Sequence, residues 1–213
     1  MQYDTIVPNN VNFFMTTIPD WTYNSMMEEI KEIEKDFTYG EEANDYLAGN
    51  IRKEFTLKKS KKILEPYIIE LSNKYLNNNA SAIRSEKGAL DNALGIKLGS
   101  LWVNFQQKHE FNPNHTHAGV LSFVIWMQIP YTLAEEQAKG PGAKSQANLP
   151  GCFELSYTDV LGNICHHTIR ADKTHEKKLL IFPAKLTHCV YPFYTSDDYR
   201  ISVSGNIKFE VRN

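Results

Sequence analysis

The sequence predicts a mainly β fold with flanking α-helices, in which a double-stranded β-helix (jelly roll) forms the core and N-terminal helices pack outside it. Two observations predict this fold. The first half of the chain carries apolar residues at three- and four-residue spacing, which is typical of amphipathic helices. The second half consists of short segments rich in Val, Ile, Phe, Tyr, Trp and Thr, separated by turn residues, which is typical of a two-sheet β architecture.

The whole chain, residues 1–213, is long enough for a single domain with a sizeable core, and residues 1–93 are expected to be its mostly helical part. One helix is predicted within residues 22–37. A second is predicted around residues 64–75, with Pro66 in its first turn. The apolar positions that mark the two helix faces are Met26, Ile30, Ile33 and Phe37 in the first helix and Leu64, Ile68, Leu71 and Tyr75 in the second.

Residues 94–213 are expected to form the jelly-roll core, and short apolar segments at 11–18 and 51–57 would add edge strands to it. Residues 131–150 interrupt the strand pattern. They are rich in Ala, Gly, Lys and Gln, show no clean period, and are expected to form a lid loop. The predicted core strands are 98–106, 120–129, 151–158, 163–170, 178–183, 187–192 and 199–210.

Bulk properties narrow the class of protein. The formal net charge of −2 gives no electrostatic reason to expect nucleic-acid binding. The most apolar run, residues 120–131, is shorter than the ~20 residues that span a membrane, and the N-terminus lacks the pattern of a secretory signal. The three cysteines form an odd set without a CxxC motif, which suits a reducing compartment, so a cytoplasmic protein is expected.

Three histidines carry the strongest functional signal. His115 and His117 stand two positions apart in NPNHTHAG, so an extended strand would point both to one face. His188 lies far downstream in LLIFPAKLTH, and Arg200 and Ser202 follow it in YRISVSGNI, again two apart. Three convergent imidazoles make a metal site, and a guanidinium beside a hydroxyl makes a carboxylate clamp.

This constellation resembles the Fe(II)/2-oxoglutarate-dependent oxygenases, and the second half of the chain is similar to their prolyl-hydroxylase-like branch, including its uncharacterised bacterial and phage members. The resemblance implies that His115 and His188 bind Fe(II) and that Arg200 and Ser202 grip the far carboxylate of 2-oxoglutarate. One departure matters, because His117 stands where the family usually has Asp or Glu. If His117 ligates, the site is a three-histidine site without an anionic protein ligand.

The resemblance also implies the reaction: with O₂ as second co-substrate, 2-oxoglutarate would be split to succinate and CO₂ while an unactivated C–H bond is hydroxylated. A peptidyl-prolyl substrate follows from the branch alone, and a small molecule is equally open. Two other classes stay open as well. A cupin-like three-histidine metalloenzyme that does not use 2-oxoglutarate would explain His117 better, but it leaves Arg200 unexplained. A non-catalytic jelly-roll binding module would make the histidines structural. The sequence does not decide the oligomeric state, and a homodimer is compatible with it.

Alternating polar and aromatic residues on two predicted strands are candidates for the pocket lining, although a half-buried strand would show the same pattern. The candidates are Trp102, Asn104 and Gln106 on the first strand and Trp126 and Gln128 on the second. The remaining histidines, His109, His166, His167 and His175, are expected not to be ligands. A salt bridge from Arg200 to Asp197 or Asp198 is the alternative to the clamp.

Overall fold

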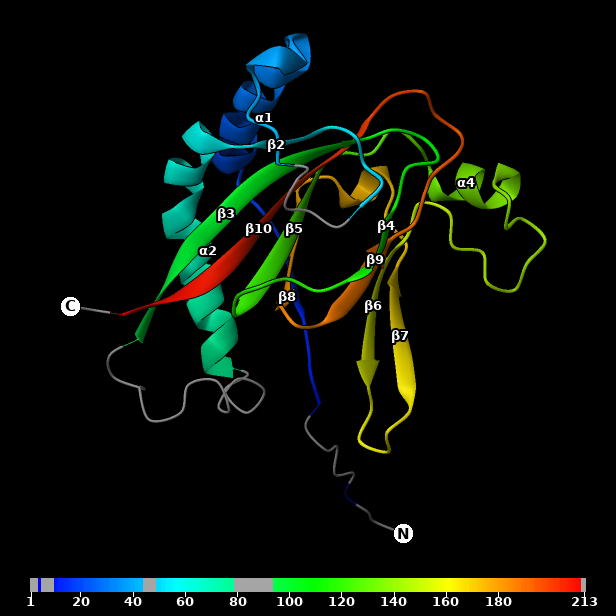
Figure 1. Ribbon diagram of the computed structural model, residues 1–213. Coiled ribbons are helices and arrows are strands. Elements are labelled where there is room, and N and C mark those ends of the chain that lie inside the picture. Colours follow the sequence, from blue (N-terminus) through cyan, green and yellow to red (C-terminus); the bar gives the residue numbers. More distant parts are fainter. Residues whose placement is uncertain (1–3, 5–9, 44–48, 79–93, 212–213) are drawn as a thin grey trace.

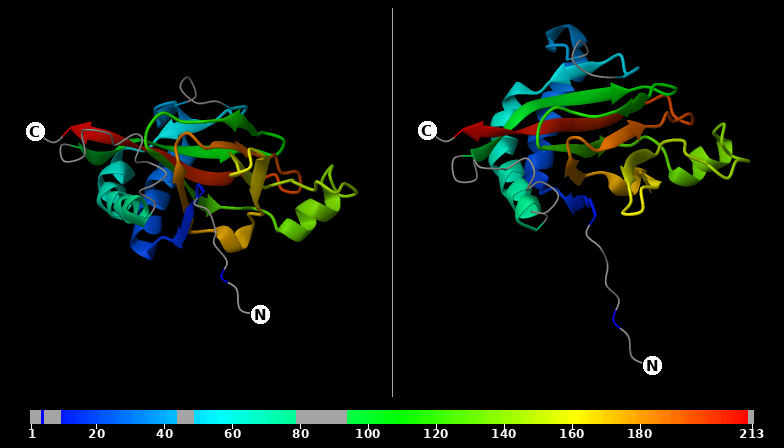
Figure 2. Two further views of the ribbon diagram at one scale, coloured as in Figure 1. Left: turned by 90° about the horizontal axis from the view of Figure 1, so that it is seen from below. Right: turned by 60° about the horizontal axis from the view of Figure 1, so that its bottom comes forward.

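Two antiparallel β-sheets face each other in the computed structural model, and two long helices cover the outer side of the larger sheet (Figures 1 and 2). The structure describes residues 4, 10–43, 49–78 and 94–211. The strand order of the larger sheet is β1 (Phe14–Thr17), β8 (Lys178–Pro183), β5 (Leu121–Gln128), β10 (Arg200–Val211), β3 (Leu94–Gln106) and β2 (Glu54–Thr56). The order of the smaller sheet is β4 (Asn112–His115), β9 (Thr187–Val190), β6 (Phe153–Thr158) and β7 (Ile164–Ile169). The helices are α1 (Asp20–Lys35), α2 (Lys58–Asn78) and α4 (Leu133–Lys139), with short 3₁₀ turns at Phe37–Tyr39 and Lys173–His175.

Strand alternation gives the larger sheet two different faces. Val103 of β3 pairs with Phe55 of β2 and Val203 of β10, and all three belong to the core cluster that α1 and α2 complete. Successive side chains of a strand point to opposite faces. The neighbouring positions, including Asn104 and Ser202, therefore face the smaller sheet, where they line a cavity. The larger sheet thus separates the apolar core on the helix side from a face that carries a polar cavity wall on β2, β3 and β10 and a second apolar cluster on β5 and β8.

The predicted fold class is confirmed. Each of the seven predicted core segments contains a strand, and the segments at 11–18 and 51–57 supply β1 and β2, the two edges of the larger sheet. Both predicted helices are present as α1 and α2, whereas residues 79–93 of the N-terminal part lie outside the described residues. None of the helices described is long and apolar enough to cross a membrane.

The expected position of Pro66 is wrong, because α2 begins at Lys58 and the proline lies inside it. The cause is a tertiary cap. The carboxylate of Glu29 on α1 accepts hydrogen bonds from the backbone N–H groups of Lys58, Lys59 and Ser60 at 2.9, 3.0 and 2.7 Å. These groups have no partner within their own helix, so an acceptor from α1 lets the helix start two turns earlier. Burial of the apolar face of α2 against the sheet outweighs the backbone hydrogen bond that the proline removes.

The lid segment 131–150 is not a loop throughout, because α4 occupies Leu133–Lys139. The helix is held by a polar anchor that apolar periodicity does not reveal. Glu136 is fully buried, and its carboxylate accepts hydrogen bonds from the backbone N–H groups of Tyr194 and Thr195 at 2.9 and 2.7 Å. Residues 141–150 contain turns and bends but no helix or strand.

Candidate metal and co-substrate site

The structure brings the three predicted histidines together. His115 at the end of β4 pairs directly with His188 on β9, and His117 follows in the next segment, where its backbone N–H donates to the Ala184 carbonyl at 2.8 Å. Their ligand nitrogens all lie within 4.8 Å of one another. Strand pairing therefore supplies two members of the group, and the chain leaving β4 supplies the third.

Backbone carbonyls fix the orientation of two of the rings. The Nδ1 atom of His115 lies 2.7 Å from the Pro113 oxygen, and that of His188 lies 2.9 Å from the Leu186 oxygen. A carbonyl can only accept, so in both rings Nδ1 carries the hydrogen. Each neutral ring then keeps the lone pair of Nε2 for a metal, an arrangement that metal-binding histidines commonly show.

Burial keeps the three imidazoles neutral. It lowers the pKa of His188 to about 3 and that of His117 to about 4, with smaller contributions from the neighbouring His115. The pKa of His115 is lowered by burial as well. The ring of His188 lies against the rings of Phe153 and Phe182, with centroids 5.6 and 4.9 Å away. Neutral imidazole is the form that binds metal, and a compact set of three fits a divalent transition metal.

A cavity between the two sheets joins the histidines to the polar face of the larger sheet. Of the predicted lining candidates, Trp102, Asn104 and Gln106 do line it, and so does Ser202. The cavity also contains Glu54 of β2, which carried no functional signal in the sequence because it is a single acid beside Arg52 and Lys53 in the predicted edge strand. The polar residues of the cavity wall are Glu54, Asn104, Gln106, Asn112, Ser202 and Ser204, besides the three histidines.

Trp126 and Gln128 do not line the cavity. The Trp126 ring packs against that of Phe153, with centroids 6.0 Å apart, in an apolar cluster between the sheets. Gln128 donates a hydrogen bond to the Tyr199 carbonyl at 3.0 Å. Both residues stand toward the end of β5, beyond Phe123 and Val124, which do line the cavity, and their own alternation does not encode how far along the strand the cavity reaches.

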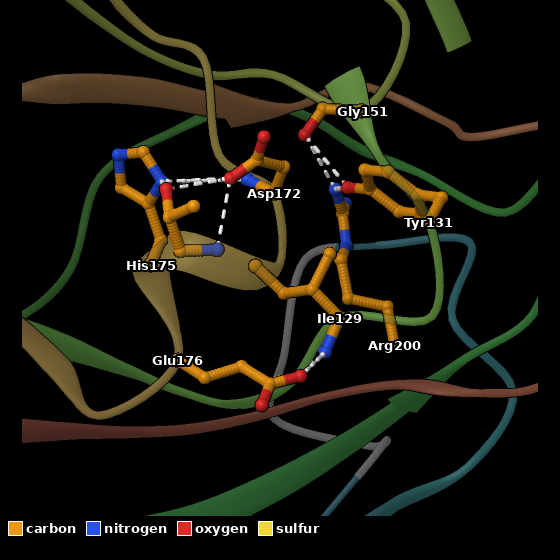
Figure 3. Close-up of polar contacts among 8 residues, drawn as sticks. Ile129, Tyr131, Gly151, Asp172, His175, Glu176 and Arg200 are labelled. Carbon is orange, nitrogen blue, oxygen red and sulfur yellow. Dashed lines mark hydrogen bonds and ion pairs between the residues drawn. The ribbon is translucent and has the colours of Figure 1, made fainter. Parts of the chain in front are cut away.

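Arg200 lies beside the cavity, where its guanidinium is held by neutral acceptors. It opens β10 and is 4% exposed. It donates to the Gln106 side-chain oxygen at 2.9 Å, the Tyr131 hydroxyl at 2.7 Å, and the carbonyls of Gly151 and Tyr191 at 2.7 and 3.0 Å. Figure 3 shows its approach to Tyr131 and Gly151. Tyr131 had no functional signal in the sequence, since it appears only as the first residue of the predicted lid segment.

The alternative salt bridge from Arg200 to the preceding turn does not form. Asp197 pairs with Lys108, and no ion pair to Arg200 is found among the residues that the structure describes. A buried cation without an anionic partner is costly, which is a reason to expect that an anion completes this site.

The other four histidines lie elsewhere, as expected. His166 bonds Ser156 and lies 3.3 Å from a Glu154 oxygen, and His167 packs on Phe13. His109 packs on Tyr194. His175 lies beside Asp172 in a short 3₁₀ turn, away from Arg200 (Figure 3). Across the described part of the chain, His115, His117 and His188 are the group whose ligand atoms are close enough to share a metal ion.

Comparison with known proteins agrees with this geometry. The family described as "Putative 2OG-Fe(II) oxygenase" matches residues 100–206, just over half of the chain, which includes all three histidines and Arg200. No curated protein matches the sequence.

Solved structures share the fold. A prolyl-4-hydroxylase from Pseudomonas putida is 12% identical with a TM-score of 0.51, and the match covers 95% of this chain and 94% of that one. AviO1 from Streptomyces viridochromogenes Tue57 is 11% identical with a TM-score of 0.51, over 92% of this chain and 90% of that one. With the fold, the histidine group and the family match in agreement, the chain belongs to the 2OG-Fe(II) oxygenase family and is an enzyme that uses Fe(II) and 2-oxoglutarate.

Proposed function

We propose that this enzyme hydroxylates a C–H bond, with Fe(II) held by His115, His117 and His188. The observation that carries the proposal is the convergence of three neutral imidazoles on one cavity. Bound Fe(II) supplies the oxygen chemistry. The chain holds the ligand nitrogens in place through the Pro113 and Leu186 carbonyls and surrounds His188 with aromatic rings that exclude water.

We propose Arg200 and Ser202 as the co-substrate clamp. Arg200 itself does not line the cavity, but Gln106 does, and the Gln106 oxygen accepts a hydrogen bond from Arg200. A carboxylate that enters from the cavity would take the place of this neutral oxygen, because a charge-assisted pair is stronger than a neutral one. Ser202 stands on the same strand face, two residues along, where its hydroxyl lines the cavity.

The family match favours this reading over both alternatives, a metalloenzyme without 2-oxoglutarate and a non-catalytic binding module. For the substrate, the resemblance to the prolyl-hydroxylase-like branch makes a peptidyl proline the first compound to test, followed by small molecules. We also propose a cytoplasmic location. The three cysteines are free, and two of them are buried, which suits a reducing compartment.

The test is an anaerobic titration with Fe(II) and 2-oxoglutarate, following the charge-transfer absorption of the chelated metal. Wild type should develop the band. His188→Ala should not, because it removes one of only three protein bonds to the metal. His175→Ala is the matched control and should behave as wild type. A band of full strength in His188→Ala would remove His188 from the site, and a wild type that binds Fe(II) without any band would exclude chelation by 2-oxoglutarate.

A further inference from the structure

A buried carboxyl group stands in the same cavity as the three histidines. Glu54 is 2% exposed and lines the cavity from β2, the edge strand of the larger sheet. It pairs with Asn104 of β3, which in turn pairs with Ser202 of β10. The three side chains therefore form one row across the cavity wall. Phe55, the next residue after Glu54, points to the opposite face of the sheet, into the core against the helices.

This position is unfavourable for a charged carboxylate. Burial raises the pKa of Glu54 to about 7, and the nearby Glu110 carboxylate contributes to the rise. Glu110 is itself 3.8 Å from Arg52 and accepts the Gln107 N–H. The other titratable residues on the cavity wall are His115, His117 and His188, and none of the described wall residues is a lysine or an arginine.

The three-histidine group lacks a negative charge that such sites usually have. Neutral imidazoles bring no charge, so a divalent ion bound by them keeps both of its positive charges. A ligand set with a carboxylate would cancel one of them. Two net charges in a cavity walled by buried side chains are costly, and the cost falls when an anion is nearby.

We propose that Glu54 compensates for the carboxylate that His117 replaces: it ionises when a divalent metal binds and balances the charge of the metal from the cavity wall without ligating it. The proposal rests on the three-histidine site of the proposed function. The proton leaves the Glu54 carboxyl for the solvent, and no bond to the metal is required. Consistent with this, Glu54 is not among the residues whose ligand atoms group together in the described chain.

The first test measures Mn(II) binding to wild type and Glu54→Gln by calorimetry, without 2-oxoglutarate, at about pH 6.5. Gln has the shape of the protonated acid, so the fold should persist, and a thermal melt checks this. Affinity for Mn(II) should fall tenfold or more in Glu54→Gln, by an approximate Coulomb argument for a buried pair. In buffers of different ionisation enthalpy, wild type should release part of a proton on binding, and Glu54→Gln should release less.

Glu70→Gln is the matched control. Glu70 lies on α2, on the far side of the larger sheet from the cavity, and pairs with Lys74 in solvent. Its substitution is the same Glu-to-Gln change at an exposed position and should leave Mn(II) affinity within about twofold, because exposed charges are screened. Unchanged affinity and proton release in Glu54→Gln would overturn the proposal.

A double-mutant cycle with His117→Asp separates charge compensation from a merely structural role. His117→Asp places a carboxylate at the ligand position itself. It should raise Mn(II) affinity far more in the Glu54→Gln background than in wild type, and the double variant should approach wild-type affinity. Additive effects would overturn the proposal. His188→Ala tests the metal site separately. If this variant binds Mn(II) as wild type does, the three-histidine assignment is wrong. If His188→Ala loses Mn(II) binding and Glu54→Gln has no effect, only the role of Glu54 is overturned.

Discussion

At the scale of single residues, Arg200 has two roles: it holds several segments together, and it supplies a positive charge for an anion. Its guanidinium donates hydrogen bonds to Gln106, Tyr131 and two backbone carbonyls where β10 begins. It is also a buried positive charge, which is the kind of group that binds a dicarboxylate. Neutral acceptors satisfy its hydrogen bonds but not its charge. The site is therefore preorganised for an anion, and its geometry exists before the anion arrives.

Replacing Arg200 with Ala should weaken 2-oxoglutarate binding about tenfold to a hundredfold, which corresponds to roughly 1.5–3 kcal/mol for a hydrogen bond to a charged group. Lys should rescue only part, because it lacks the planar fork that reaches several acceptors. The measurement is a 2-oxoglutarate titration at saturating Mn(II), with Mn(II) affinity as the internal control. Equal 2-oxoglutarate affinity in wild type and Arg200→Ala would refute the clamp.

At the scale of elements, one carboxylate caps the start of α2 and another holds α4 in place. Glu29 caps three N–H groups of α2, and Glu136 anchors α4 against the segment at Tyr194 and Thr195. Both contacts join segments that are far apart in the sequence. Apolar periodicity located α2 but could not place its start, and it missed α4 altogether. The predicted strands are present because alternation is a local property, whereas these anchors are tertiary contacts. Strand β4 was not among the predicted core strands, because its four residues show no apolar alternation.

Glu29→Ala should lower the free energy of unfolding by roughly 2–3 kcal/mol, since it removes a charged acceptor from buried N–H groups at a helix start. Urea unfolding of the metal-free protein measures this. Glu70→Ala is the control, because it removes an exposed partner of Lys74 and should cost less than about 0.5 kcal/mol. A loss as small in Glu29→Ala as in the control would show that the cap contributes little.

In limited proteolysis, residues 141–150 should be cleaved before α4. Lys144 is exposed in a stretch without helix or strand, whereas Lys139 lies in the last turn of α4, next to the buried Gly140. Trypsin should therefore cut after Lys144 before it cuts after Lys139, which mass spectrometry of early fragments can show. Prior cleavage after Lys139 would mean that the Glu136 anchor does not hold the helix. If the segment acts as a lid, as the sequence predicts, its cleavage should be slower once substrate is bound.

At the scale of the whole molecule, the larger sheet divides the protein into a part that gives stability and a part that carries out chemistry. Sequence alone identified both, because Val203 and its neighbours alternate with Ser202 along β10. It also found the three histidines, from the two-residue spacing of His115 and His117 and from the resemblance to the oxygenases, which added His188. It could not find Glu54, since a single buried acid has no pattern, nor the neutral partners of Arg200, which come from four separate segments. These features depend on how the sheets face each other.

The contribution of Glu54 to the stability of the metal-free protein should fall as pH rises from about 4.5 to about 7, whereas His117 and His188, whose pKa values are lowered from 6.5, make stability rise with pH up to about 6.5. The unfolded Glu54 carboxyl ionises near 4.5, whereas the folded one holds its proton to about 7, so this group binds more of its proton in the folded state across this window. Glu54→Gln removes the contribution of Glu54. It should be more stable than wild type at about pH 8, by an amount on the order of 3 kcal/mol, and nearly equal to it near pH 4.5. The same difference in unfolding free energy between wild type and Glu54→Gln at both pH values would contradict this.

Because His115 pairs with His188, a metal bound at the reaction centre would also hold strands of the smaller sheet together. β4 is an edge strand of that sheet and, among the described strands, pairs only with β9, with an irregular register between Asn112 and His115. A metal shared by His115, His117 and His188 is a cross-link between β4, β9 and the chain that leaves β4, three segments that only the fold brings together. Amide hydrogen exchange should therefore slow along β4 when Mn(II) binds, while the interior strands β5 and β10 change little.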